Sequence, residues 1–87
     1  MVQASQVLQL CPGYRLGLQQ TELAWLHGPH ETVALSGLAS LILQALDGQR
    51  SVRIIATELA PLFGEPPGML EDVLLFLEAA QARHWVC

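Results

Sequence analysis

The sequence contains no lysine, and its permanently charged basic side chains are four arginines: Arg15, Arg50, Arg53 and Arg83. Eight aspartate and glutamate residues outnumber them, so the formal net charge is −4. A protein that holds nucleic acid through phosphate contacts needs a dense basic face, because phosphate neutralisation supplies most of the affinity. The composition therefore argues against this class of partner, and we expect no nucleic-acid binding.

Long apolar runs are also absent, since no stretch reaches the roughly 18 residues that a membrane-spanning helix requires. The opening residues, MVQASQVLQLCPGY, have neither a basic start nor a long apolar block, so they do not fit a secretory signal. We therefore expect a cytoplasmic protein without a membrane partner.

Cysteine is scarce, with Cys11 and Cys87 near the two ends of the chain. A disulfide between them requires the termini to meet, and the reducing cytoplasm disfavours such bonds. The sequence accordingly favours two unpaired thiols of no special role.

Signals of catalysis are few. His27 and His30 form an H-x-x-H pair, but no Cys or second His pair nearby supplies the further ligands that a zinc site usually needs, so they fit a polar turn. Cys11 has no base beside it in sequence. Glu71 and Asp72 fit the first turn of a helix, where carboxylates stabilise the positive end. With no glycine-rich phosphate loop either, we expect no catalytic residue, no metal, no cofactor and no enzyme activity.

Hydrophobic residues, in contrast, make up 52% of the 87 residues and charged residues 14%, which suits a single domain with one core. Residues 1–11 show no clear period and are predicted to form a flexible N-terminal arm, with the folded domain spanning residues 12–87. Alternating apolar positions predict short strands over residues 14–18, 23–27 and 32–35, separated by a polar connection and a turn over residues 28–31.

Helical patterns fill the second half of the chain. Ser36 and Ser51 are suited to cap two helices, the first ending at Asp47 and the second failing around Pro61. A breaker cluster at residues 66–68 precedes a final helix over residues 69–86. Three short antiparallel strands followed by three helices predict an α+β fold of the winged helix-turn-helix kind.

The apolar face of the final helix is unusually broad. At about 100° per residue its apolar side chains span an arc of roughly 180°, whereas a helix that covers a core needs roughly 100°. Part of this arc is therefore predicted to face a partner. Val73 and Leu77 lie at its centre and favour the core, while Leu70 and Leu74 are the better candidates for contact.

Several segments together match a known family in order and spacing. They include PGYRL, VALS, LDGQRSV, EDV and FLE, within residues 12–86. On these residues the sequence resembles the PqqD family, small chaperone-like proteins of pyrroloquinoline quinone (PQQ) biosynthesis and the founding form of the precursor-peptide recognition element. Ser36 stands where the family usually has asparagine, and Glu31 where the hairpin turn commonly has glycine. These departures leave another modified-peptide pathway open as an alternative.

The resemblance implies a non-enzymatic chaperone that binds a ribosomally made, PqqA-like precursor peptide and presents it to a PqqE-like radical SAM enzyme. It also implies that the peptide adds as a strand beside the third strand, against the last helix. The positions that this binding mode selects here are Thr32, Val33, Ala34, Leu35, Leu70, Val73, Leu74 and Leu77. An edge strand offers unpaired backbone groups that suit this mode.

Two further hypotheses stay open at this point. A small DNA-binding winged-helix regulator would use the second helix in a groove, although the net charge of −4 argues against it. Self-association into a homodimer would use the same apolar helix face, either alongside peptide binding or in place of it.

Overall fold

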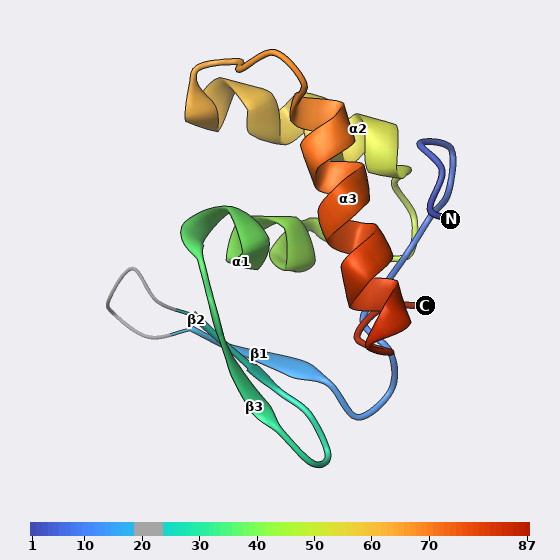
Figure 1. Ribbon diagram of the computed structural model, residues 1–87, viewed down its shortest axis with the longest axis vertical. Helices are drawn as coiled ribbons and strands as arrows, with labels where there is room; N and C mark the ends of the chain where they lie inside the picture. Colours follow the sequence, from blue (N-terminus) through green and yellow to red (C-terminus); the bar gives the residue numbers. More distant parts are fainter. Residues whose placement is uncertain (19–23) are drawn as a thin grey trace.

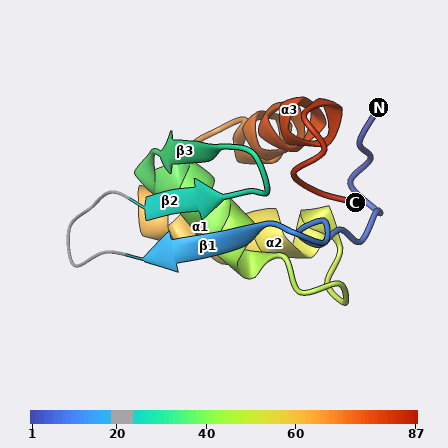
Figure 2. The ribbon, with the colours of Figure 1, turned by 90° about the horizontal axis from the view of Figure 1, so that it is seen from below.

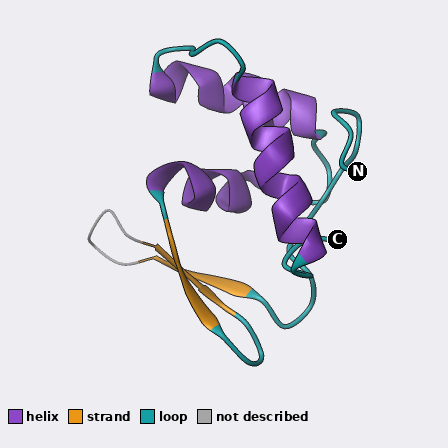
Figure 3. Ribbon diagram, viewed as in Figure 1, coloured by secondary structure: helices purple, strands orange, loops and turns teal. Residues whose placement is uncertain are grey.

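The computed structural model describes residues 1–18 and 24–87, and its elements follow the predicted order. Three strands precede three α-helices and a short 3-10 turn, which confirms the α+β prediction (Figures 1 and 3). The bounds are β1 (Arg15–Leu18), β2 (Ala24–His27), β3 (Thr32–Leu35), α1 (Gly37–Ala45), α2 (Val52–Leu59), η1 (Ala60–Phe63) and α3 (Met69–Ala82). The predicted polar connection over residues 19–22, and Leu23 of the second predicted strand, lie outside the described residues.

The strands form one antiparallel sheet in the order β1-β2-β3, so β3 is an edge strand. The register pairs Leu26 of β2 with Leu16 on one side and Val33 on the other. The turn between β2 and β3 is closed by the Gly28 amide, which donates to the Glu31 carbonyl over 2.8 Å. Figure 2 shows β3 on the side of the sheet nearest α3, with β1 farthest from it.

Helices α1 and α2 begin at the two serines that were predicted to cap them. The Ser36 hydroxyl accepts from the Ala39 amide, and the Ser51 hydroxyl from the Ile54 amide, both over 3.3 Å. Each bond satisfies a first-turn amide that the helix itself leaves without a partner. Pro61 marks the change from α2 to the tighter turn η1, as its missing amide requires.

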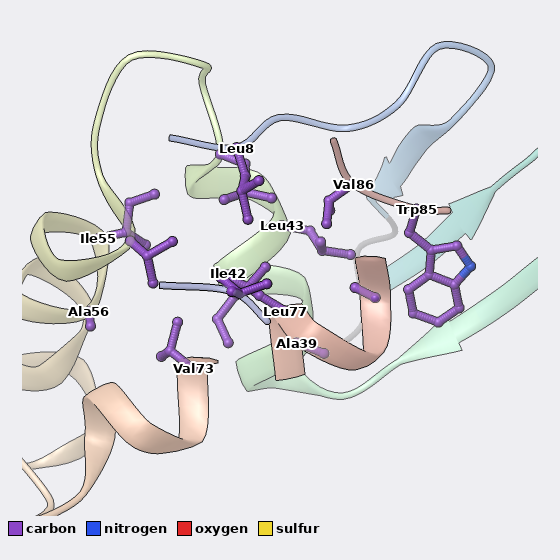
Figure 4. Close-up of a cluster of buried hydrophobic side chains, with 14 of the residues drawn as sticks. Leu8, Ala39, Ile42, Leu43, Ile55, Ala56, Val73, Leu77, Trp85 and Val86 are labelled. Carbon is purple, nitrogen blue, oxygen red and sulfur yellow. The ribbon is translucent and has the colours of Figure 1, made fainter. Parts of the chain in front are cut away.

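The core lies where the three helices meet the inner face of the sheet (Figure 4). Its largest fully buried side chains come from β2 and all three helices: Leu26, Ile42, Leu43, Ile55, Leu77, Val52 and Val73. No polar side-chain atom buried among the described residues lacks a hydrogen-bond partner. The core therefore fixes α3 in one position relative to the sheet.

The final helix is shorter than predicted. It ends at Ala82, and His84 adopts a positive φ of 63°, which turns the chain away from the helix axis. Residues 85–87 then run beside the N-terminal segment, where Gln9 and Cys87 exchange backbone hydrogen bonds of 3.0 and 2.9 Å. The helical period predicted that the helix continues through Trp85, because Trp85 falls on the apolar side of the pattern. Trp85 is indeed buried, but it lies beyond the end of the helix.

Residues 1–11 pack against the domain, contrary to the predicted flexible arm. Val2 and Leu8 are buried, and Val7 and Leu10 form isolated bridges with Ser51 and Val86. The first half of the segment also accepts hydrogen bonds from amides at the start of α2. These partners lie far along the chain, so the local sequence carries no periodic signal of the packing.

Cys11 and Cys87 form a disulfide, so the prediction of two unpaired thiols is wrong. Their Cα atoms lie 5.3 Å apart, and the Cys11 amide donates to the Trp85 carbonyl over 2.9 Å. The prediction rested on the reducing cytoplasm, whereas the fold brings the two chain ends side by side. The bond closes a covalent loop across a sequence separation of 76 residues.

Candidate functional site

The outer edge of β3 is the first component of the site. Within the described sheet β3 pairs only with β2, so its other edge has backbone groups without a strand partner. Thr32 and Ala34 are exposed, Val33 is partly buried and Leu35 is buried. An edge of this kind accepts an additional strand through main-chain hydrogen bonds.

Helix α3 is the second component, and it lies on the same side of the molecule as β3 (Figure 2). Val73 and Leu77 have 0% of their surface exposed and pack in the core with Ile42 and Ile55 (Figure 4). They anchor the helix and offer no surface to a ligand. Their inclusion among the predicted contact residues is therefore wrong, although the core packing favoured for them is confirmed.

Leu70 and Leu74, the predicted contact residues of α3, face other neighbours. Leu70 lines a cavity of about 260 Å³ together with α2 residues such as Ala56 and Thr57. Leu74 lines a depression of about 370 Å³ together with Met1 and other residues outside the sheet. No β3 residue lines either space, so the structure does not bring Leu70 and Leu74 together with residues 32–35.

Phe76 lies on the opposite side of α3 from Leu74. Two residues further along a helix rotate a side chain by about 200°, which places the two about 160° apart. Figure 2 shows the N-terminal segment on one side of α3 and β3 on the other. Because Leu74 faces Met1, Phe76 lies on the side of β3, where it is partly buried. The broad apolar arc contained this residue, but periodicity could not tell which margin of the arc faces the sheet.

Trp85 ties the segment after α3 to the turn between β2 and β3. Its indole N–H donates to a Glu31 carboxylate oxygen over 3.0 Å, and the Arg83 guanidinium carbon lies 5.4 Å from the ring centroid. Trp85 is 6% exposed and belongs to the same core cluster as Val86 (Figure 4). These contacts hold the turn between β2 and β3 against the segment that follows α3. They also give Glu31, which departs from the family's usual glycine, a specific partner.

Charged groups elsewhere serve local structure. Asp47 accepts hydrogen bonds from the Arg50 and Gln49 amides over 2.9 Å, and these bonds lower the pKa of its carboxyl to about 2. Arg50 forms ion pairs with Asp47 and Glu58 across the turn between α1 and α2. This cluster fixes the turn between α1 and α2, and none of its residues belongs to the sheet.

Other kinds of site find little support in the residues that the structure describes. Across residues 1–18 and 24–87, no three His, Cys, Asp or Glu side chains gather as metal ligands. His27 ends β2 and His30 lies in the following turn, as the polar-turn interpretation predicted. No described helix has the length and apolar character that crossing a membrane would demand.

Comparison with known proteins addresses the whole of this architecture. The family model for Coenzyme PQQ synthesis protein D (PqqD) matches residues 22–86, which include β2, β3 and all the helices. The chain belongs to the PqqD family. A similar protein, PqqA binding protein 1 of Pseudomonas putida, is 36% identical over 83 residues, covering 94% of this chain and 91% of that protein.

Solved structures place the PqqD fold in two settings. The solution structure of the PqqD truncation of Methylobacterium extorquens PqqCD, described as a functional, stand-alone recognition element for ribosomally synthesised and post-translationally modified peptides, matches with a TM-score of 0.84 and 25% identity. That match covers 100% of this chain and 95% of the other. A heterocyclase solved with substrate and cofactor matches with a TM-score of 0.66 and 26% identity, over 93% of this chain and 10% of that chain.

Proposed function

We propose that the protein is a precursor-peptide recognition element of PQQ biosynthesis, which binds a PqqA-like peptide and presents it to a PqqE-like radical SAM enzyme. Family membership, a relative named for binding PqqA and a solved recognition element of the same fold support this proposal. The single observation that carries it is the free edge of β3 beside α3. We further propose that the protein acts in the cytoplasm, where ribosomes make the peptide, and catalyses no step itself.

The peptide adds to β3 as a fourth strand. Main-chain groups of residues 32–35 supply the hydrogen bonds, each with a net contribution of about 1 kcal/mol. Side chains of a strand stand roughly perpendicular to the sheet, so those of Thr32 and Ala34 leave the backbone edge of β3 open to pairing. Backbone pairing of this kind accepts many sequences, and selectivity must come from side-chain contacts.

Phe76 supplies such a contact in place of Leu70 and Leu74. About 160° around α3 from Leu74, its partly buried ring faces the side of β3, where it can cover one apolar side chain of the peptide. The hydrogen bond between Trp85 and Glu31 holds the turn between β2 and β3 against the segment after α3, so this end of the β3 edge is fixed before the peptide arrives. An edge that is already fixed avoids part of the ordering cost of binding, which is about 0.5–1.5 kcal/mol for each side chain that binding immobilises.

Titration of the isotope-labelled protein with the precursor peptide tests this function. We expect a dissociation constant in the micromolar range or tighter, with amide shift changes concentrated at residues 32–35 and on the Phe76 side of α3. No binding below about 100 μM, equivalent to about −5.5 kcal/mol, would contradict the proposal.

A second candidate is recognition of a peptide from another modification pathway. The match to a heterocyclase favours it, since the same fold makes up a tenth of that larger chain. Parallel titrations with a PqqA-like peptide and with a heterocyclase substrate peptide separate the two functions. Tighter binding of the second peptide would assign the protein to that other pathway, with the same binding site.

A further inference from the structure

The face of α3 that points away from β3 carries a second surface. It is the depression of about 370 Å³ lined by Met1, Val2, Glu71, Leu74, Leu75 and Glu78, which we call the acid-rimmed depression. The N-terminal segment forms one wall and α3 the other (Figure 1). Because α3 separates it from the β3 edge, a peptide on β3 leaves it open (Figure 2).

The lining of this depression is apolar and accessible. Leu75 is 66% exposed and Met1 93%, beside the partly buried Leu74. Single exposed apolar side chains are ordinary on protein surfaces, whereas neighbouring ones gathered in a concave site mark an interaction surface. Packing of the domain itself does not require Leu75, since the core is closed by Val73 and Leu77 on the opposite side of the helix.

Two carboxylates flank the apolar centre. Glu71 and Glu78 lie seven residues apart on one stripe of α3, separated by about 10 Å along the helix axis. The helix N-terminus stabilises Glu71, but Glu78 lies too far along the helix to benefit. Among the described residues the ion pairs both belong to Arg50, so neither rim carboxylate is neutralised there.

This combination of charge and shape selects a basic partner with an apolar centre. A second copy of the chain fits poorly, because each copy carries a net charge of −4 and has no lysine. Of its arginines, Arg50 is engaged by Asp47 and Glu58, and Arg83 stacks on Trp85. The other two, Arg15 and Arg53, lie on separate elements, β1 and α2, and so do not form a basic pair on one element. The partner is therefore a different protein that presents an apolar side chain between lysine or arginine residues.

We propose that the acid-rimmed depression is the docking surface for the enzyme that modifies the bound peptide. This inference rests on the proposed function, in which the peptide must be held while an enzyme acts on it. Docking on the far side of α3 lets the enzyme bind without displacing the peptide from β3. The enzyme then reaches the part of the peptide that extends beyond the short strand.

The test uses the full chain, the PqqE-like radical SAM enzyme and the precursor peptide. Leu75→Ser removes the apolar centre, and Leu62→Ser is its matched control, since Leu62 in η1 is also 66% exposed. A second pair reverses charge, with Glu71→Lys and Glu78→Lys on the rim and Glu65→Lys and Asp72→Lys outside the depression. Both double variants change the net charge equally and place one lysine in the first turn of α3.

We expect Leu75→Ser and the rim reversal each to weaken enzyme binding about tenfold or more, because the first removes the apolar centre of the contact and the second replaces attraction by like-charge repulsion. The two controls should bind the enzyme within about threefold of the parent, and all four variants should keep the parent's peptide affinity. Binding of the parent to the enzyme should also weaken as salt is raised, more steeply than binding of the rim reversal.

The remaining outcomes separate the docking surface from peptide recognition. Equal enzyme binding by rim and control variants, or no enzyme binding by a parent that binds the peptide, overturns the docking surface and leaves peptide recognition intact. Rim-dependent enzyme binding by a parent that fails to bind the peptide supports the docking surface and removes the proposed function.

Discussion

Truncation of Phe76 tests the geometry of the peptide site, with Leu74 as its matched control. Both side chains are partly buried on α3, and they point about 160° apart. Of the two, Phe76 lies on the side of β3, so Phe76→Ala should weaken binding of the peptide while Leu74→Ala should not.

The size of the effect follows from the surface that the peptide can cover. An aromatic side chain has about 150–250 Å² of surface, and on the order of 50 Å² of a partly buried ring is free to be covered. At about 25 cal/mol per Å² this coverage contributes roughly 1 kcal/mol. Truncation also leaves the peptide side chain without its neighbour, so we expect a total loss of about 1–2 kcal/mol, or about 5- to 30-fold in affinity.

Isothermal calorimetry with the precursor peptide measures this loss, and thermal unfolding of each variant checks that the domain stays folded. Both alanine variants should lose comparable stability, of about 1–2 kcal/mol, because both side chains are partly buried. The opposite result would be that Leu74→Ala weakens peptide binding as much as Phe76→Ala, or that Phe76→Ala leaves the affinity of a folded protein unchanged. Either outcome would contradict the placement of the peptide beside Phe76.

Three further predictions concern the contacts around the site. Replacing Cys11 and Cys87 with serine should lower the free energy of unfolding by about 3–4 kcal/mol, because the bond closes a long loop; an unchanged urea midpoint would contradict this. Glu31→Ala should lower the free energy of unfolding by about 1 kcal/mol and raise the solvent exposure of Trp85, measured by fluorescence quenching with Trp85→Phe as the reference. Unaltered quenching would argue against the hydrogen bond between Glu31 and Trp85. Because the pKa of Asp47 is lowered from 3.8 to about 2, its stabilising effect should be complete above pH 4 and disappear as the pH falls through 2. The free energy of unfolding of Asp47→Asn should therefore equal that of the parent only in acid. A difference between the two that stays constant with pH would contradict this prediction.

The element order could be predicted because the deciding signals are local. Ser36 and Ser51 cap helices through their own first turns, and Pro61 ends α2 by its missing amide. The inward positions of β3 follow from simple alternation, with Leu35 buried as expected. In each case the residue and its physical effect lie within about four positions of one another.

Features that depend on distant segments could not be predicted in this way. Val2 and Leu8 enter the core singly, and their neighbours belong to elements far along the chain. The same packing brings the N-terminal segment beside the Leu74 margin of α3, so that the Phe76 margin lies toward the sheet. Periodicity gave the width of the apolar arc but not the identity of its neighbours, so it could not tell the Leu74 margin from the Phe76 margin.

The disulfide illustrates a different limit. Its prediction depended on whether the chain ends meet, which neither cysteine spacing nor composition reveals. Reciprocal hydrogen bonds between Gln9 and Cys87 bring the ends together. The bond therefore supports the segment that carries Trp85, and so it belongs to the framework of the site.

Hydrogen exchange of the β3 amides tests strand addition most directly. With saturating peptide, the outward-pointing amides among residues 32–35 should exchange at least tenfold more slowly, while the amides of η1 at residues 60–63 keep their rates. Protection of these β3 amides is the result that the proposal predicts. Unchanged exchange along β3 in a protein that is saturated with peptide would contradict it.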